Sequence, residues 1–173
     1  MFTGRCNFRC PFCHNASLVL HPSEQPTVEP EELFTLLRRR KGLLDGVECD
    51  VIAGLESRGF IFGMPLAYDM HKPFAPIRKK GKLPRETISE SYALEYGTAE
   101  IEMHVDAVKP GQKVVLVDDL IATGGTMEAA IRLVERLGGQ VVKIIFLMEL
   151  AGLEGRQRLK GYDVASVVSY PGK

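Results

Sequence analysis

The chain has 173 residues, and its 22 basic and 22 acidic side chains give a formal net charge of zero. Hydrophobic residues make up 45% of it, which excludes a disordered chain, and the charge balance gives no bulk electrostatic reason to bind nucleic acid or an anionic membrane. No apolar run approaches the roughly 20 residues of a membrane helix, and the first ten residues, MFTGRCNFRC, contain no apolar signal segment. We therefore expect a cytoplasmic protein with no nucleic-acid and no membrane partner.

Residues 1–48 differ in style from the rest and are predicted to form an irregular or helical arm. Cys6, Cys10 and Cys13 lie here in a C-x3-C-x2-C array. Because no signal segment precedes them, such bunched cysteines favour metal or cluster ligation over disulfides. Residues 30–44 begin with proline and acids and carry a late basic run, a pattern typical of a helix.

From residue 49 to residue 173, apolar strands alternate with amphipathic helices, and this region is predicted to be a second domain. Helices are predicted over 59–71 and 126–139, and residues 81–91, which lack an apolar period, are predicted to form a long loop. The predicted strands are 49–55, 74–79, 92–97, 99–105, 113–119, 141–150 and 163–170. Strands that are apolar throughout indicate an α/β fold with an open, mainly parallel twisted sheet flanked by helices.

The segment VVLVDDLIATGGT, residues 114–126, carries the clearest chemistry. Asp118 and Asp119 end a predicted buried strand, where ligands bind in open α/β sheets, and a carboxylate offers paired acceptors to vicinal ribose hydroxyls. Backbone N–H groups at the start of the next helix form a seat for a phosphate, with small or hydroxyl-bearing residues around it: Ala122, Thr123, Gly124, Gly125 and Thr126. The pattern indicates a phosphorylated sugar as ligand. The alternative is that the two acids only cap the helix.

VVLVDDLIATGGT resembles the phosphoribosyl-pyrophosphate (PRPP) binding motif of type I phosphoribosyltransferases. The resemblance runs from about Asp50 to the C-terminus, includes GLESRGFIFG, RKKGKLPRET and YALEYG, and is closest to the adenine phosphoribosyltransferases. It implies the type I phosphoribosyltransferase fold and a homodimer. It also implies a reaction of purine salvage, in which PRPP and adenine give AMP and pyrophosphate with Mg²⁺ as cofactor.

The resemblance further implies a role for each matching position. Residues 122–126 would hold the 5′-phosphate, and Asp118 and Asp119 the ribose hydroxyls. Glu95, with Tyr96 beside it, matches the proposed catalytic acid or base. The cations implied to face the pyrophosphate, one of them reaching a neighbouring subunit, are Arg58, Arg78, Lys79 and Lys82. The alternatives are that these cations are solvated surface charges and that Glu95 is an exposed strand residue.

The chemistry of the reaction fits those roles. Breaking the bond between C1 and pyrophosphate leaves negative charge on the leaving group, which Mg²⁺ and a ring of Arg and Lys stabilise. Adenine loses a proton as it attacks, so a carboxylate can accept that proton or hold the base. The predicted loop over 81–91 is expected to act as a lid that keeps water from the reacting centre.

The cysteine segment CNFRCPFCHN resembles the cluster motif of radical S-adenosylmethionine (SAM) activating enzymes. That resemblance implies a [4Fe–4S] cluster on Cys6, Cys10 and Cys13, with SAM at the open iron. It ends near Val47, and about 48 residues cannot build the barrel that such enzymes need. The alternatives are free thiols or adventitious zinc. Cys49, beside a buried strand, is predicted to be a small core residue.

The N-terminal segment also has no counterpart to the hood that contacts the base in the adenine family. Three hypotheses follow. The first is an adenine phosphoribosyltransferase acting as a homodimer. The second is a PRPP- or nucleotide-binding module that lacks full activity because the hood is missing. The third is an Fe–S and SAM-binding protein in which the transferase half is a scaffold.

Overall fold

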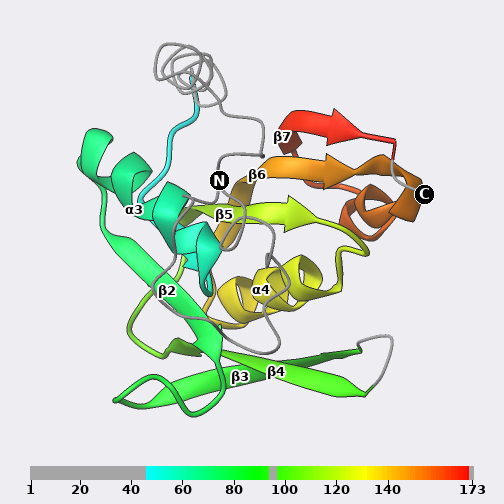
Figure 1. The fold of residues 1–173 in the computed structure, drawn as a ribbon. Coiled ribbons are helices and arrows are strands. Elements are labelled where there is room, and N and C mark those ends of the chain that lie inside the picture. Colours follow the sequence, from blue (N-terminus) through cyan, green and yellow to red (C-terminus); the bar gives the residue numbers. More distant parts are fainter. Residues whose placement is uncertain (1–45, 94–96, 172–173) are drawn as a thin grey trace, which may run out of the picture. The chain divides into compact units, whose positions relative to one another are not determined.

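The computed structural model describes residues 46–93 and 97–171 (Figure 1). Contacts divide the chain into two units, Met1–Lys41 and Gly42–Lys173, and every described residue belongs to the second. The helix predicted over 30–44 and the three clustered cysteines lie outside the described residues. Within the described ranges, no helix is long and apolar enough to cross a membrane.

The described part of the second unit is built on a seven-stranded sheet in the order β3-β4-β2-β1-β5-β6-β7. Strands β2, β1, β5, β6 and β7 run parallel, whereas β4 is antiparallel to β2 and to β3. The expected open, mainly parallel sheet is therefore confirmed. The strands are β1 (Val51–Leu55), β2 (Phe74–Lys79), β3 (Thr87–Ala93), β4 (Thr98–His104), β5 (Lys113–Ile121), β6 (Gln140–Leu150) and β7 (Val164–Tyr170).

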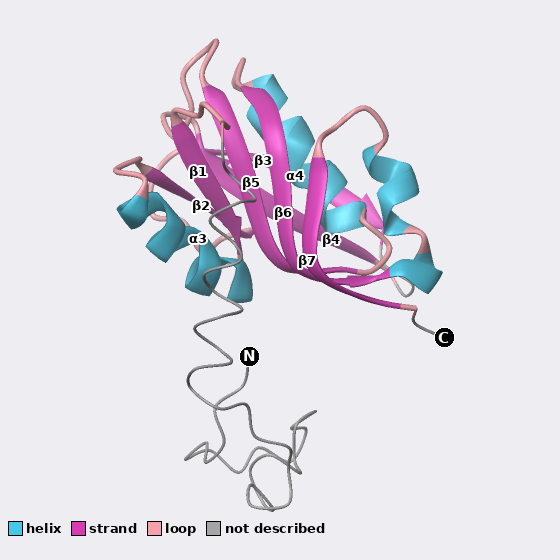
Figure 2. Cartoon of the chain, turned by 90° about the horizontal axis from the view of Figure 1, so that it is seen from above, coloured by secondary structure: helices cyan, strands magenta, loops and turns pink. Residues whose placement is uncertain are grey.

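Helices cover both faces of this sheet, as Figure 2 shows for α3 (Arg58–Asp69) and α4 (Gly125–Arg136). Because successive side chains of a strand point to opposite faces, β1 contributes to both cores. Its Ile52 packs in the cluster that includes Ala67 of α3, and its Val51, Ala53 and Leu55 pack in the cluster that includes α4. This two-sided burial explains why β1 reads as an unbroken apolar run.

Two short 3-10 helices follow β6, namely η3 (Ala151–Leu153) and η4 (Gly155–Leu159). They connect β6 to β7 and bring η4 beside the segment that joins β5 to α4. Cys49 is 4% exposed and packs in the cluster on the α3 face, so its predicted place in the core is confirmed.

The prediction of a long loop over 81–91 is wrong in its second half. Strand β3 begins at Thr87 and pairs with β4 along its whole length. Ile88 and Tyr92 pack against the core that includes α4, but Glu90 interrupts this alternation. Glu90 instead forms ion pairs with Arg132 and Arg136 of α4. The acid at this core-facing position therefore obscured the strand pattern. Of the predicted loop, residues 81–86 remain outside a strand, and their expected role as a lid stays a prediction.

Candidate active site

The segment between β5 and α4 is a tight glycine turn. Gly124 has a φ of +80°, and a Cβ added there would lie 2.6 Å from the carbonyl oxygen of Gly155. Both the left-handed backbone and this close approach require glycine. Within the described residues, the N-cap of α4 is Gly124 and no side chain makes a capping hydrogen bond, so the N–H groups of the first turn are available to an anion. The predicted phosphate seat is thus a glycine turn that opens a 12-residue helix.

The η4 segment supports this turn from behind. A Cβ on Gly155 would lie 2.3 Å from the carbonyl oxygen of Ala122. The next residue, Arg156, places its Nε 2.7 Å from Oε1 of Glu149, and the hydroxyl of Ser166 donates to Oε2 of the same carboxylate at 2.7 Å. The hydrogen bond from Arg156 lowers the pKa of Glu149, so the pair stays charged. This network, which the sequence reasoning missed, fixes Gly155 against the glycine turn.

Asp118 and Asp119 lie inside β5 and not at its end. The strand continues to Ile121 because its pairing with β6 continues as far as Glu149. Oδ1 of Asp118 accepts the N–H of Asp119 at 2.8 Å. Burial raises the pKa of Asp118 well above its usual range; the N–H of Asp119 opposes this and the negative charge of Asp119 adds to it. The pair therefore places two adjacent carboxyl groups at one edge of the sheet.

An ion pair of Arg58 links the segment that follows β1 to strand β5. Arg58 is the first residue of α3, and its Nε lies 2.7 Å from Oδ2 of Asp119. Half of the Arg58 side chain remains exposed, so the guanidinium can contact a ligand as well as the carboxylate. The structure thus brings together the predicted ribose acids and one of the predicted pyrophosphate cations.

Glu56, which follows β1, accepts hydrogen bonds from the basic segment at the end of β2. Oε2 accepts from Arg78 Nε at 3.2 Å and from the N–H of Lys79 at 3.0 Å, and Oε1 lies 2.5 Å from Lys82 Nζ. Burial raises the pKa of Glu56, but the hydrogen bonds from Lys82, Lys79 and Arg78 outweigh it and lower that pKa below its usual value. Sequence reasoning missed Glu56, although an acid directly after a buried strand was the signal used for Asp118.

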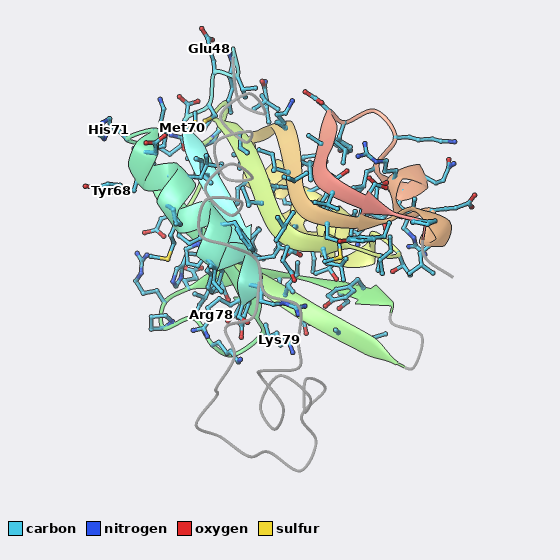
Figure 3. The ribbon with its side chains drawn as sticks, turned by 45° about the horizontal axis from the view of Figure 1, so that its top comes forward. Glu48, Tyr68, Met70, His71, Arg78 and Lys79 are labelled. Carbon is cyan, nitrogen blue, oxygen red and sulfur yellow. The ribbon has the colours of Figure 1, made fainter. Side chains whose placement is uncertain are left out.

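Strands β2, β1 and β5 are parallel neighbours, so their carboxyl ends meet at one edge of the sheet. Figure 3 shows Arg78 and Lys79 at this end of β2 and Glu48 at the opposite end of the sheet. The Lys79 side chain is exposed. Glu95, Tyr96 and the cysteine array Cys6, Cys10 and Cys13 lie outside the described residues.

A divalent metal fits this edge only if a ligand supplies part of its coordination. Across residues 46–93 and 97–171, no cluster of three His, Cys, Asp or Glu side chains could hold an ion. Mg²⁺ is commonly bound by one or two carboxylates together with substrate phosphates. Asp118 and Asp119 offer that kind of donor set, so the site fits a Mg²⁺ ion that arrives with a polyphosphate.

Comparisons with known proteins agree with this geometry. Residues 36–169 match the family model described as a phosphoribosyl transferase domain. The adenine phosphoribosyltransferase of Agathobacter rectalis is 72% identical over 130 residues, which cover 75% of each chain. The adenine phosphoribosyltransferase of Lachnoclostridium phytofermentans is 68% identical over the same length, with the same coverage.

Solved structures give the same result. The adenine phosphoribosyltransferase of Thermoanaerobacter pseudethanolicus superposes with a TM-score of 0.78 at 48% identity, covering 90% of this chain and 86% of that one. The Saccharomyces cerevisiae enzyme, solved with an imino-altritol bisphosphate and adenine, gives a TM-score of 0.72 at 39% identity, with 80% and 81% covered. Motif, site geometry and these comparisons together establish that the chain belongs to the adenine phosphoribosyltransferase family.

Proposed function

We propose that the chain transfers the phosphoribosyl group of PRPP to adenine, giving AMP and pyrophosphate, at the carboxyl ends of β1, β2 and β5. The observation that carries the proposal is the meeting of three elements at one edge: the Asp118–Asp119 pair, the glycine turn before α4, and the cations beside Glu56 and Asp119. Carboxylates suit the ribose hydroxyls, and a helix N-terminus suits the 5′-phosphate.

The cations serve the leaving group. As the C1–oxygen bond breaks, negative charge accumulates on pyrophosphate while N9 of adenine forms the new bond to C1. Arg58, Arg78 and Lys82 each sit beside a carboxylate, at 2.7, 3.2 and 2.5 Å. Pyrophosphate oxygens can take the place of those carboxylates, because phosphate accepts the same charge-assisted hydrogen bonds. Exposed Lys79 lies at the end of the same strand and adds positive charge.

Two parts of the proposal rest on the family resemblance. Mg²⁺ would be held by Asp118 and Asp119 together with substrate oxygens, and when bound it neutralises charge that develops on the leaving group. Glu95, with Tyr96 beside it, would accept the proton that adenine loses, a contribution typically worth about 10²–10⁴-fold in rate. The predicted contact between one basic residue and a neighbouring subunit belongs here as well.

One assay tests the reaction directly. The full chain is incubated with PRPP, Mg²⁺ and labelled adenine, and AMP is separated from the base. Formation of AMP and pyrophosphate in equal amounts is the expected result. PRPP binding without AMP would instead identify a binding module that lacks activity, and the absence of both would refute the proposed site.

We also propose a homodimer that uses the outer face of α3. Ile61, Met64 and Tyr68 follow helical spacing on that face and are 62, 55 and 84% exposed. Figure 3 shows Tyr68 pointing away from the sheet. Sedimentation should give twice the mass of the chain, and Tyr68→Glu should shift it towards the monomer. The matched control is Tyr170→Glu, at a tyrosine that is 51% exposed on β7; equal behaviour of the two variants would contradict this interface.

Other expectations about the chain stay predictions. They are the division into an arm over 1–48 and a domain over 49–173, the cytoplasmic location, and the [4Fe–4S] cluster with SAM on the N-terminal cysteines. Anaerobic reconstitution with iron and sulfide tests the cluster, because a colourless product would remove that hypothesis.

A further inference from the structure

A buried carboxylate on β4 has no part in the chemistry described above. Glu102 is 4% exposed, although a carboxylate that loses its water needs several hydrogen bonds in return. Its Oε1 accepts the N–H groups of Lys82 at 2.9 Å and Leu83 at 2.8 Å, and Oε2 accepts the hydroxyl of Thr87 at 3.2 Å. The N–H of Gly81 also donates to this carboxylate. Three successive main-chain N–H groups therefore converge on one side chain.

The turn that Glu102 binds has little other main-chain support. Strand β2 pairs with β4 at only two positions, Arg78 with Glu102 and Lys79 with Ile101. One more main-chain bond, from the N–H of Lys80 to the oxygen of Glu100, closes that ladder at 3.1 Å. Beyond it the backbone turns through Gly81, whose φ is +83°. The carboxylate thus replaces the ladder as the anchor of the turn.

The position of this turn sets the position of two cations. The side chain of Lys82 reaches Oε1 of Glu56, and the carbonyl oxygen of Lys82 accepts from Nη1 of Arg78 at 3.1 Å. Both cations therefore depend on where the main chain of Lys82 lies. We propose that Glu102 is a positioning residue for pyrophosphate, which holds the turn so that Arg78 and Lys82 face the leaving group. This inference rests on the proposed function for its kinetic consequence.

The charge state of Glu102 supports this role. Burial raises its pKa, but hydrogen bonds from the N–H groups of Leu83, Gly81 and Lys82 and from Thr87 outweigh burial and lower the pKa below its usual value. The anchor therefore stays ionised at neutral pH. Loss of its charge by substitution should weaken every hydrogen bond to the turn at once, because charge-assisted bonds are roughly twice as strong as neutral ones.

The test compares Glu102→Gln with Glu100→Gln. Glu100 lies two positions earlier on β4 and accepts from the side chains of Lys80 at 2.8 Å and Ser89 at 2.5 Å, but not from the main chain of Gly81–Leu83. For Glu102→Gln we expect KM for PRPP to rise about tenfold and KM for adenine to change less than about twofold. Amide hydrogen exchange of residues 81–83 should accelerate, while exchange in β1 and β5 stays as in the unsubstituted chain.

Other outcomes would overturn the proposed role of Glu102. A KM for PRPP in Glu102→Gln that equals that of Glu100→Gln would overturn the inference, and so would exchange that accelerates throughout the sheet. If Glu102→Gln does not fold, Thr87→Val removes one bond to the same carboxylate and should raise KM for PRPP about twofold to threefold; no rise would overturn the inference. If the unsubstituted chain makes no AMP, the proposed function fails, and exchange at 81–83 still tests the anchor by itself.

Discussion

Replacing Gly124 by alanine should weaken the fold and the PRPP site together. The added Cβ would meet the carbonyl oxygen of Gly155 at 2.6 Å, and the residue would keep a φ of +80°. The left-handed backbone costs about 1–2 kcal/mol for a residue with a side chain, and overpacking costs about 1–3 kcal/mol. The free energy of unfolding should therefore fall by about 2–5 kcal/mol.

Gly111→Ala separates these two contributions. Gly111 has a φ of +81°, but a Cβ there would meet nothing within 4 Å. The free energy of unfolding of Gly111→Ala should fall by only about 1–2 kcal/mol. Any effect of alanine on the unfolded chain is common to both variants. Urea unfolding followed by circular dichroism gives both values. We also expect a raised KM for PRPP in Gly124→Ala alone. Two variants whose stabilities agree within about 0.5 kcal/mol would refute the close-contact argument.

Three further predictions concern charged and polar groups. Asp118→Asn combined with Asp119→Asn should lower PRPP affinity at least about hundredfold in calorimetry without unfolding the chain. Because the pKa of Asp118 is raised in the folded chain, ionisation of this group destabilises the fold as the pH rises, and asparagine removes that penalty. Retained PRPP affinity in the double variant would contradict the ribose assignment. Glu149→Gln should cost about 1–3 kcal/mol in urea unfolding at pH 7, because the lowered pKa of Glu149 stabilises the fold above the ordinary glutamate range. The difference should shrink as the pH falls through that pKa, and a constant difference would argue against the ion pair as its cause. The hydrogen bond to Glu135 raises the pKa of Tyr162 to about 12, so ultraviolet titration should show a late phenol that disappears in Tyr162→Phe. Its stabilising effect is present below the ordinary tyrosine range and is lost as the pH rises through 12.

Local patterns were sufficient to predict the parallel part of the sheet. The apolar runs around Ile52 and Leu116 are buried on both faces, so the sequence shows them without reference to partners. The glycine turn and the two acids of β5 were equally visible, because ligand chemistry imposes residue types at fixed positions. Residues 87–91 of strand β3 were missed because Glu90 faces two arginines of α4, a pairing that depends on the folded arrangement.

The supporting residues of the site were invisible for the same reason. Glu56, Glu102 and Glu149 each bind groups that lie seven or more positions away in the chain, and an isolated glutamate carries no sign of such partners. Gly155 likewise looks like an ordinary turn residue until Ala122 is placed against it. Sequence patterns thus predicted the groups meant for the ligand, and the folded chain was needed to find what holds them.

The carboxylate of Glu56 has a consequence for competition among anions. Arg78 and Lys82 are both paired with it before any ligand arrives, so its negative charge offsets part of their positive charge. A small ion such as chloride or free phosphate must displace an internal carboxylate that is tethered at high effective concentration. A ligand that is already bound through its sugar and 5′-phosphate must displace the same carboxylate, but its pyrophosphate end is then also held at high effective concentration. Glu56 therefore weakens the binding of abundant small anions at this edge and favours a polyanionic ligand that binds at several points.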